Sequence, residues 1–172
     1  MVLHLRRAVA AELDLVLAAE SDPEAARFIL RWSRAQHEQA LDDPDQGHLL
    51  VTDDDRPVGF VLLAGILSDS RSVEIRRIVV SPRGTGLGRQ ALSLVADHAF
   101  ETLGAHRLWL DVITHNERAR RAYSAAGFVE EGVLRDAVYT GESFESLVVM
   151  SILASEWAAR ERAPSPIRSD AI

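Results

Sequence analysis

The stretch from Ser72 to Leu103 constrains the fold of this chain more than any other. Residues 73–80 are mostly apolar and β-branched, which predicts a strand, and residues 81–88 form a loop rich in glycine. After the loop, apolar residues recur at helical spacing. These positions are Leu92, Val95, Ala99 and Leu103. A strand, a glycine-rich loop and a helix in this order predict that the chain is organised around a binding loop.

The loop has the composition of an anion-binding site. Glycine lacks a Cβ atom, so Gly84, Gly86 and Gly88 can adopt conformations that turn successive N–H groups toward one point. The helix that follows directs the positive end of its dipole to the same point. We therefore predict a ligand that contains phosphate. An ordinary solvated turn is the alternative.

The same residues also fit a dinucleotide-binding fingerprint. Residues 86–91 read Gly-Leu-Gly-Arg-Gln-Ala, and Asp111 ends the next predicted strand, where an acidic residue would bind a ribose. In that fold the first glycine follows its strand almost directly, whereas here residues 81–83 intervene and Pro82 interrupts the strand. A dinucleotide oxidoreductase is kept as an alternative function.

Composition limits the classes of protein to which the chain can belong. Its 172 residues are 47% hydrophobic, so we expect a single domain over residues 1–162. Residues 163–172 lack periodicity and are expected to be a disordered tail. No apolar run reaches membrane-spanning length, and residues 1–7 lack the long apolar region of a signal peptide, so we expect a cytoplasmic protein without a membrane partner.

The net charge and the reactive residues limit the partners, the catalytic mechanisms and the metal sites that we expect. A net charge of -7 disfavours nucleic acid as a partner and mildly favours a cationic acceptor. The chain has no cysteine, which excludes disulfides and thiolate catalysis. The six histidines lack metal-site spacing, so no metal is expected.

Hydrophobic patterns predict the other elements. A helix over residues 23–41 should begin at the capping sequence Ser21-Asp22-Pro23-Glu24. Trp32 within it could line an acceptor pocket, although a core or interface position is the simpler interpretation. The strand at 106–112 should run parallel to the strand at 73–80, because a helix connects them. Further strands are expected at residues 2–8, 48–52, 57–67, 129–135 and 143–153, and a further helix at 12–20.

A second pattern follows the strand at 106–112. Thr114 and Glu117 have the spacing of a capping box, which would leave Asn116 free to face a ligand. Seven residues are nearly two helical turns, so Asn116 and Tyr123 should share one face of the helix. Gly127 should end that helix in a left-handed conformation, with Phe128 packed behind it.

These two patterns together resemble the GCN5-related N-acetyltransferase (GNAT) family. The resemblance rests on Arg83-x-x-Gly86-x-Gly88 after the strand, and on the sequence from Asn116 through Tyr123 to Gly127-Phe128. It implies a splayed, mixed and mostly antiparallel sheet of about seven strands flanked by helices. Residues 134–136 and 149–157 also resemble the ribosomal-protein N-terminal acetyltransferase branch.

The resemblance implies an acetyl-CoA site and two catalytic residues. Tyr123 would protonate the departing thiolate, although it could instead be a tyrosine of the core. Glu74 would be the base, although it could instead be an exposed strand residue or an ion-pair partner of Arg76 or Arg77. The backbone at Ile78–Val80 would bind the pantetheine arm and stabilise the tetrahedral intermediate. The implied cofactor-binding residues are Ile78, Val79, Val80, Arg83, Gly84, Thr85, Gly86, Leu87, Gly88, Arg89, Asn116, Arg120 and Tyr123.

Acetyl transfer explains why a carboxylate is needed. An attacking amine must be neutral, whereas an aliphatic amine has a pKa of about 10.4 and a peptide α-amine about 7.7 to 8.0. Without a covalent nucleophile, direct transfer in a ternary complex is the simplest mechanism. We expect the acceptor to be a protein N-terminus or a small amine, and the protein to be a monomer or homodimer. A non-catalytic acyl-CoA binder stays open as an alternative.

Overall fold

The structure is a computed structural model that describes residues 3–82 and 84–161. Its strands are β1 (Leu3–Arg7), β2 (Gln46–Asp53), β3 (Arg56–Ala64), β4 (Ser72–Val80), β5 (Arg107–Ile113), β6 (Val129–Tyr139) and β7 (Phe144–Leu153). Its α-helices are α1 (Leu13–Glu20), α2 (Arg34–Asp42), α3 (Leu87–Asp97), α4 (Glu117–Ala125) and α5 (Ala154–Glu161). The predicted boundary after residue 162 and the predicted tail lie outside the described residues.

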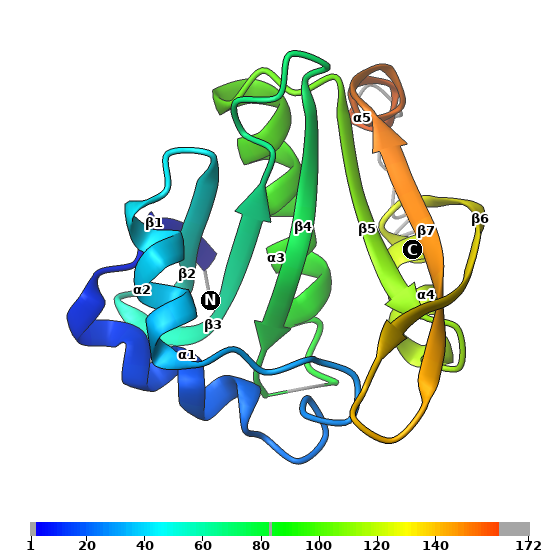
Figure 1. The fold of residues 1–172 in the computed structure, drawn as a ribbon. Coiled ribbons are helices and arrows are strands. Elements are labelled where there is room, and N and C mark those ends of the chain that lie inside the picture. The colour runs from blue at the N-terminus through cyan, green and yellow to red at the C-terminus, as the bar shows by residue number, and fades with distance from the viewer. Residues whose placement is uncertain (1–2, 83, 162–172) are drawn as a thin grey trace, which may run out of the picture.

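The strands form one seven-stranded sheet in the order β1-β2-β3-β4-β5-β7-β6 (Figure 1). Every neighbouring pair is antiparallel except β4 and β5, which run parallel with α3 between them in the sequence. This arrangement confirms the mixed, mostly antiparallel sheet. It differs from the doubly wound parallel sheet of a dinucleotide-binding fold, so the oxidoreductase alternative loses its structural basis.

The sheet is splayed at its centre. Strand β4 pairs with β5 only from Ser72 opposite Arg107 to Glu74 opposite Trp109. Immediately afterwards Arg76 has no partner on β3, which is the signature of a β-bulge, and a bulge bends its strand. Beyond this point β4 stays with β3, while β5 continues with β7 to Ile113. The two strands therefore part in the middle of the sheet, as Figure 1 shows.

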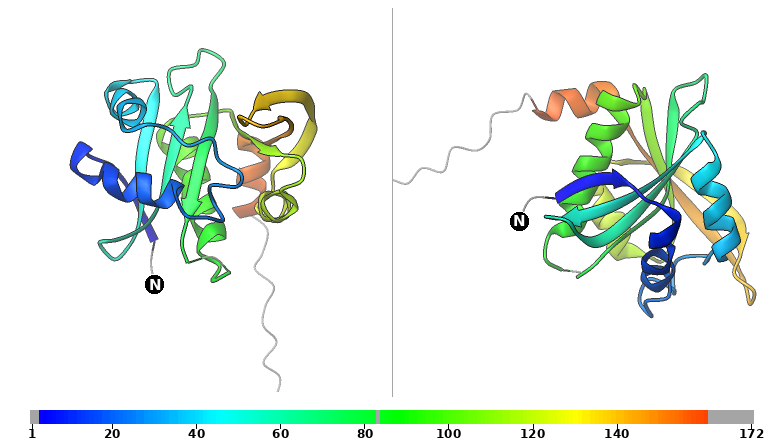
Figure 2. Two further views of the ribbon diagram at one scale, coloured as in Figure 1. Left: turned by 60° about the horizontal axis from the view of Figure 1, so that its bottom comes forward. Right: turned by 90° about the vertical axis from the view of Figure 1, so that its left-hand side faces the viewer.

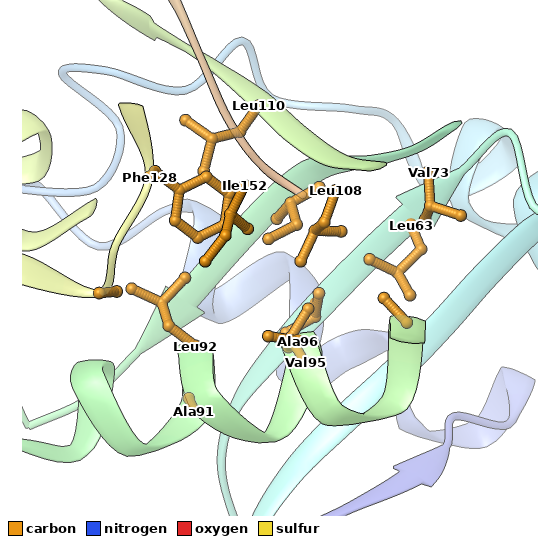
Figure 3. Close-up of a cluster of buried hydrophobic side chains, with 14 of the residues drawn as sticks. Leu63, Val73, Ala91, Leu92, Val95, Ala96, Leu108, Leu110, Phe128 and Ile152 are labelled. Carbon is orange, nitrogen blue, oxygen red and sulfur yellow. The ribbon is translucent and has the colours of Figure 1, made fainter. Parts of the chain in front are cut away.

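Helices cover both faces of the sheet. Figure 2 shows α3 and α5 on one face, and α1 and α2 on the other. Leu92 and Val95 of α3 pack on Leu108 of β5 and Ile152 of β7 in the larger core (Figure 3). A smaller cluster around Leu13 and Phe60 lies beneath α1. Both clusters leave the diverging edges of β4 and β5 free to line a site.

The predicted helix over residues 23–41 is wrong in its first half. Helix α1 ends at Glu20 and α2 begins only at Arg34, where the Ser33 hydroxyl accepts the Gln36 N–H at 3.3 Å. Asp22 does cap a turn, since its carboxylate accepts the N–H groups of Glu24 and Ala25 at 3.1 Å. Residues 21–33, which we call the crossing segment, instead run from α1 past the end of β4 toward α4 (Figure 1).

The predicted end of α4 is confirmed. Gly127 has a φ of +95°, and Phe128 is 4% exposed in the core. Arg160 of α5 reaches this end of the helix and donates to the Ala125 carbonyl at 3.3 Å. A guanidinium at a helix C-terminus offsets its negative end, so α5, which the patterns did not predict, holds α4 in place. No α-helix within residues 3–82 and 84–161 is long and apolar enough to cross a membrane.

Candidate active site

A cleft of about 900 Å³ opens where β4 and β5 part. Its walls come from β4, the glycine loop, the start of α3, the end of β5, α4 and the crossing segment. The wall residues that bear on chemistry are Glu24, Phe28, Glu74, Arg76, Ile78, Val80, Gly84, Gly86, Gly88, Arg89, Asp111, Asn116 and Tyr123. One cleft thus contains the loop of the first sequence pattern and the tyrosine of the second.

The glycine loop forms an open cradle at one end of the cleft. Gly84 and Gly86 have φ values of +79° and +84°, and Gly86 is the N-cap of α3. Among the described residues, and apart from each glycine's own chain neighbours, no heavy atom lies within 4 Å of the position that a Cβ would take at Gly84, Gly86 or Gly88. The open space and the free N–H groups of the first turn of α3 suit a phosphate group. The sequence predicted these glycine conformations, and the binding of phosphate there stays a prediction.

The other predicted loop residues have different positions. Arg89 lines the cleft, whereas Leu87 is 2% exposed and anchors α3 in the core. The Thr85 hydroxyl donates to the Pro82 carbonyl at 2.9 Å, which closes the loop on itself. Leu87 and Thr85 can therefore contribute their backbone N–H groups but not a direct side-chain contact. Arg83 lies outside the described residues.

Strand β4 offers backbone donors along the cleft. The N–H of Ser81 donates to the Val58 carbonyl on the β3 side at 2.8 Å. Successive N–H groups of a strand point to opposite edges, so those of Ile78 and Val80 point toward the space that β5 has left. Val79 packs instead into the cluster beneath α1. The Ile78–Val80 segment therefore has the unpaired edge that an amide-rich ligand arm could join as a strand.

Two predicted residues of the second pattern are corrected. Asn116, not Thr114, caps α4, because its side chain accepts the Ala119 N–H at 3.2 Å while the Thr114 N–H is held by the Ser146 carbonyl of β7 at 3.0 Å. Asn116 still lines the cleft. Arg120 points away from it.

The Arg120 side chain forms hydrogen bonds on the side of α4 that faces β6. Its guanidinium donates to the Glu130 carboxylate at 2.9 and 3.1 Å and to the Thr114 carbonyl at 3.0 Å. It is not among the residues that line the cleft. Arg120 is therefore removed from the predicted cofactor-binding set and assigned to the packing of α4.

Tyr123 has the environment of a proton donor. Its ring packs on Phe128 with centroids 6.1 Å apart, and within the described residues its hydroxyl has no hydrogen-bond partner. Burial, and to a lesser extent the charge of Asp111, raise the pKa of Tyr123 to about 12. The phenol therefore keeps its proton at neutral pH. Tyr123 packs against the core, as expected for a core tyrosine, and it also lines the cleft.

Two carboxylates flank the point where the strands part. Glu74 lies in the last residue pair between β4 and β5 and forms an ion pair with Arg76 at 3.0 Å. Asp111 lies two residues beyond Trp109, the partner of Glu74, and so projects on the same face of the sheet. From the sequence, Asp111 was expected only as a ribose-binding residue of a dinucleotide fold. The register between β4 and β5, which sequence patterns do not reveal, places it in this cleft.

A buried ion pair attaches the crossing segment to β4. Arg77 donates to Glu20 of α1 at 2.9 Å, and their side chains are 8% and 1% exposed. The same guanidinium donates to the Leu30 carbonyl and stacks 4.4 Å from the Trp32 ring centre. Glu20 also accepts the Trp32 N–H at 3.1 Å. Trp32 therefore belongs to this cluster and, against the acceptor-pocket alternative, is not among the lining residues of the cleft.

The cluster continues into two buried histidines. His37 contacts Glu20 at 3.3 Å, and its Nδ1 shares a proton with Nε2 of His48 across 3.1 Å. His48 is 1% exposed and stacks on Phe60 with centroids 6.0 Å apart. Burial, followed by the charges of His37 and Arg77, lowers the pKa of His48 to about 4. The native state therefore holds His48 neutral.

Acid should destabilise the protein partly through His48. An unfolded histidine has a pKa of about 6.5, so between pH 6.5 and pH 4 the unfolded chain binds more protons and the free energy of unfolding falls as pH falls. This contribution should reach about 3 kcal/mol. Urea denaturation across this range should show a weaker pH dependence for His48→Gln than for wild type. His106→Gln, which changes an exposed histidine, is the control. Equal pH slopes for all three proteins would contradict the prediction.

Comparison with known proteins identifies the family. The model of the acetyltransferase (GNAT) family matches residues 13–128, which include β4, the glycine loop, α3 and α4. The chain belongs to the GNAT family. The first sequence pattern, the second pattern and the splayed sheet are thus features of one family, as the resemblance implied.

Individual relatives agree with this assignment. A spermidine N(1)-acetyltransferase of Vibrio cholerae is 31% identical over 105 residues, which cover 60% of each chain. A Bacillus subtilis chain provisionally named a ribosomal N-acetyltransferase is 30% identical over 100 residues, 58% of this chain and 55% of its own. The matched stretches therefore span little more than half the length of these curated relatives.

The fold comparison covers more of the chain. A crystal structure of the Vibrio cholerae spermidine N-acetyltransferase with CoA and spermine superimposes with a TM-score of 0.80 at 25% identity. The match covers 91% of this chain and 98% of the other. The similarity thus extends well beyond the glycine loop to most of the chain.

Proposed function

We propose that this protein is an acetyl-CoA-dependent N-acetyltransferase that moves an acetyl group to a primary amine within a ternary complex. The observation that carries the proposal is the single cleft between β4 and β5. It has an open glycine cradle at Gly84–Gly88 and a group of ionisable side chains, Glu74, Asp111 and Tyr123, where the strands part. Membership of the GNAT family and the CoA-bound relative support it.

We infer that acetyl-CoA lies along the cleft. The open cradle and the N-terminus of α3 suit the pyrophosphate, with Arg89 nearby as a cation. The N–H groups of Ile78 and Val80 suit the amides of the pantetheine arm. A pantetheine arm bound in this way would bring the thioester to the point where the strands diverge, close to Glu74 and Tyr123. This is the geometry in which a backbone N–H can also stabilise the negative oxygen of a tetrahedral intermediate.

The reaction needs a proton acceptor and a proton donor. Tyr123 is the proposed donor to the CoA thiolate because it is protonated, unpaired among described residues and in the cleft. Glu74 is the base that the family resemblance implies. In the structure Glu74 forms an ion pair with Arg76, which is the structural alternative to a role as base.

The acceptor should be a protein N-terminus or a small amine. The crossing segment lines the cleft through Glu24, Phe28 and Leu30, and Val138 and Leu147 of the last hairpin line it from the other side. These two elements therefore bound the space left for an acceptor. The bound spermine of the Vibrio cholerae relative supports a polyamine, and the provisionally named ribosomal relative supports a peptide N-terminus.

Binding and turnover test the proposal separately. Calorimetry should detect acetyl-CoA and CoA but not NAD(P)H. An acceptor panel with spermidine, short peptides with free N-termini, alcohols and thiols should then give CoA release only with amines. Binding of acetyl-CoA without turnover on any amine would instead favour the non-catalytic acyl-CoA binder. Turnover of alcohols or thiols but not amines would contradict N-acetylation.

Gly86→Asp should weaken acetyl-CoA binding at least tenfold, or by about 1.4 kcal/mol. The φ of +84° at Gly86 is strained for any side chain, and a carboxylate in the cradle would repel phosphate. Isothermal titration calorimetry measures the change. Gly141→Asp, also at a positive φ of +99° but in the turn between β6 and β7, is the control for backbone strain. A folded Gly86→Asp protein with wild-type affinity would remove the loop from the cofactor site.

The oligomeric state and the cellular location of the protein stay predictions. A monomer or homodimer and a cytoplasmic location were expected from the sequence. The Vibrio cholerae relative has also been seen as a dodecamer, so light scattering of the purified protein should decide among these states. Cell fractionation tests the location.

A further inference from the structure

A second pocket, of about 260 Å³, lies beside the main cleft and shares the wall residues Glu74 and Arg76 with it. Its other walls come from the start of β2, the end of β3 and the starts of β4 and β5. Figure 1 shows these strand ends at the opposite end of β4 from the glycine loop. The second pocket therefore extends away from the glycine cradle, on the other side of the point where the strands part.

The strand register explains why a hollow forms here. Gln46 of β2 pairs with Ala64 of β3, and Ala64 pairs with Glu74 of β4. Glu74 pairs in turn with Trp109 of β5. Directly paired residues project on the same face of a sheet, so these side chains form one row across four strands. Ala64 is the small member of the row, and neighbouring strands lie about 4.8 Å apart, so Gln46 and Glu74 are walls about 10 Å apart with a low floor between them.

The walls of the second pocket present hydrogen-bond acceptors. The Gln46 amide nitrogen donates to Asp43 at 2.9 Å, whereas its amide oxygen is buried and has no partner among the described residues. One carboxylate oxygen of Asp45 accepts the Leu67 N–H at 2.7 Å. A buried acceptor that lacks a donor costs free energy. The second pocket therefore suits a ligand group that donates hydrogen bonds.

The charges around the second pocket favour a cation as that group. Arg76 lines the pocket and pairs with Glu74 at 3.0 Å, and Arg107, which donates to a wall residue, pairs with Glu131. Asp45 also lines the pocket, and within residues 3–82 and 84–161 it forms no ion pair. Its negative charge is thus left for a ligand, and hydrogen bonds between charged partners are the strong ones.

We propose that the second pocket binds a second positive charge of the acceptor, so that the preferred substrate is a linear amine with a cationic group about 10 Å from the amine that is acetylated. This inference rests on the proposed acetyltransferase function. The distal ammonium donates to Asp45 and to the Gln46 oxygen. The chain between the two nitrogens packs on Trp109 and Ala64, and the reacting amine lies near Glu74, where the strands part. Acetyl-CoA reaches the same point from the glycine cradle at the other end.

The test compares acceptors that share one chain and differ only at its far end. Diaminooctane ends in an ammonium, aminooctanol in a hydroxyl and octylamine in a methyl group. We expect kcat/KM of the wild-type protein to be at least tenfold higher for diaminooctane than for the other two. Diaminobutane, which is too short to bridge about 10 Å, should also fall at least tenfold below diaminooctane.

Asp45→Asn should lower kcat/KM for diaminooctane about tenfold, mainly through KM, and change kcat/KM for octylamine less than threefold. Asparagine keeps the oxygen that accepts the Leu67 N–H, so thermal unfolding should resemble that of wild type. Asp55→Asn, in the exposed β2–β3 turn, is the control for loss of a negative charge elsewhere and should leave both values unchanged. Ala64→Val raises the floor of the pocket without a change of charge, and should also weaken diaminooctane relative to diaminobutane.

The outcomes separate this inference from the proposed function. Equal kcat/KM for diaminooctane and octylamine, or an equal loss for both in Asp45→Asn, would overturn the second-charge pocket and leave N-acetylation intact. Aminooctanol as good as diaminooctane would mean that the pocket takes a neutral donor, which also contradicts the inference. A wild-type protein that acetylates no amine would overturn the proposed function and this inference with it.

Discussion

Replacement of Tyr123 by Phe should lower turnover by about 10² to 10⁴ while acetyl-CoA affinity is kept. The ring of Tyr123 packs against Phe128, and this contact survives in the variant. Only the hydroxyl is lost, and among the described residues it supports no hydrogen bond in the fold. Steady-state kinetics with CoA detection gives kcat, and calorimetry gives the affinity.

Tyr139→Phe is the matched control for this prediction. Tyr139 is the second of the two tyrosines in the chain, and its hydroxyl donates to the Gly141 carbonyl at 2.8 Å in the β6–β7 hairpin. Loss of that hydroxyl should leave kcat within a factor of about three. If Tyr123→Phe kept near-full turnover, Tyr123 would be a packing residue only, and water or substrate would protonate the thiolate.

The largest effect on stability is expected for Arg77→Met. This change leaves the Glu20 carboxylate buried at 1% exposure without its cation. Removal of one partner of a buried pair costs about 3–5 kcal/mol, since the remaining charge is uncompensated. Methionine fills much of the volume of the arginine stem, so the loss reports the charge and not a cavity. Urea denaturation at pH 7 measures the free energy of unfolding.

Two comparisons isolate the buried pair. Arg34→Met removes an ion pair with Asp14 whose side chains are 43% and 83% exposed, and should cost less than about 1 kcal/mol. The double variant Glu20→Gln/Arg77→Met should recover part of the loss, because no unpaired charge stays buried. A loss for Arg77→Met as small as that of Arg34→Met would show that the cluster is not a major source of stability.

Arg77→Met should also affect the acceptor site. Its guanidinium holds the Leu30 carbonyl and the Trp32 ring of the crossing segment, which forms one wall of the cleft. Release of this segment should raise KM for the amine more than KM for acetyl-CoA, because the cradle at Gly84–Gly88 lies on a different element. Equal changes in both KM values would indicate a general loss of structure.

The sequence by itself determined the parts of the site that depend on local chemistry. Gly86 and Gly127 both adopt the positive φ values that their positions predicted, because a left-handed residue between two elements strongly favours glycine. The strand before the loop and the helix after it followed from hydrophobic periodicity. Asn116 and Tyr123 both line the cleft, as predicted from the helical repeat, which fixes directions within one helix.

The tertiary structure decided everything that depends on contacts between distant residues. The capping sequence at Ser21 predicted a helix, yet Glu20 and Arg77, 57 positions apart, hold residues 21–33 in an irregular path. Asn116 caps α4 in place of Thr114, whose N–H bonds to Ser146 of β7. Such non-local bonds compete with local propensity and leave no mark in a short window of sequence.

The juxtaposition of Glu74, Asp111 and Tyr123 is of the same kind. Glu74 and Asp111 lie on strands that pair for three residues and then part at the bulge beside Arg76. A shift of one residue in that register would have turned Asp111 to the opposite face, into the core. Strand register is set by the packing of the whole sheet, so the sequence supplied the side chains and the fold brought them into one cleft.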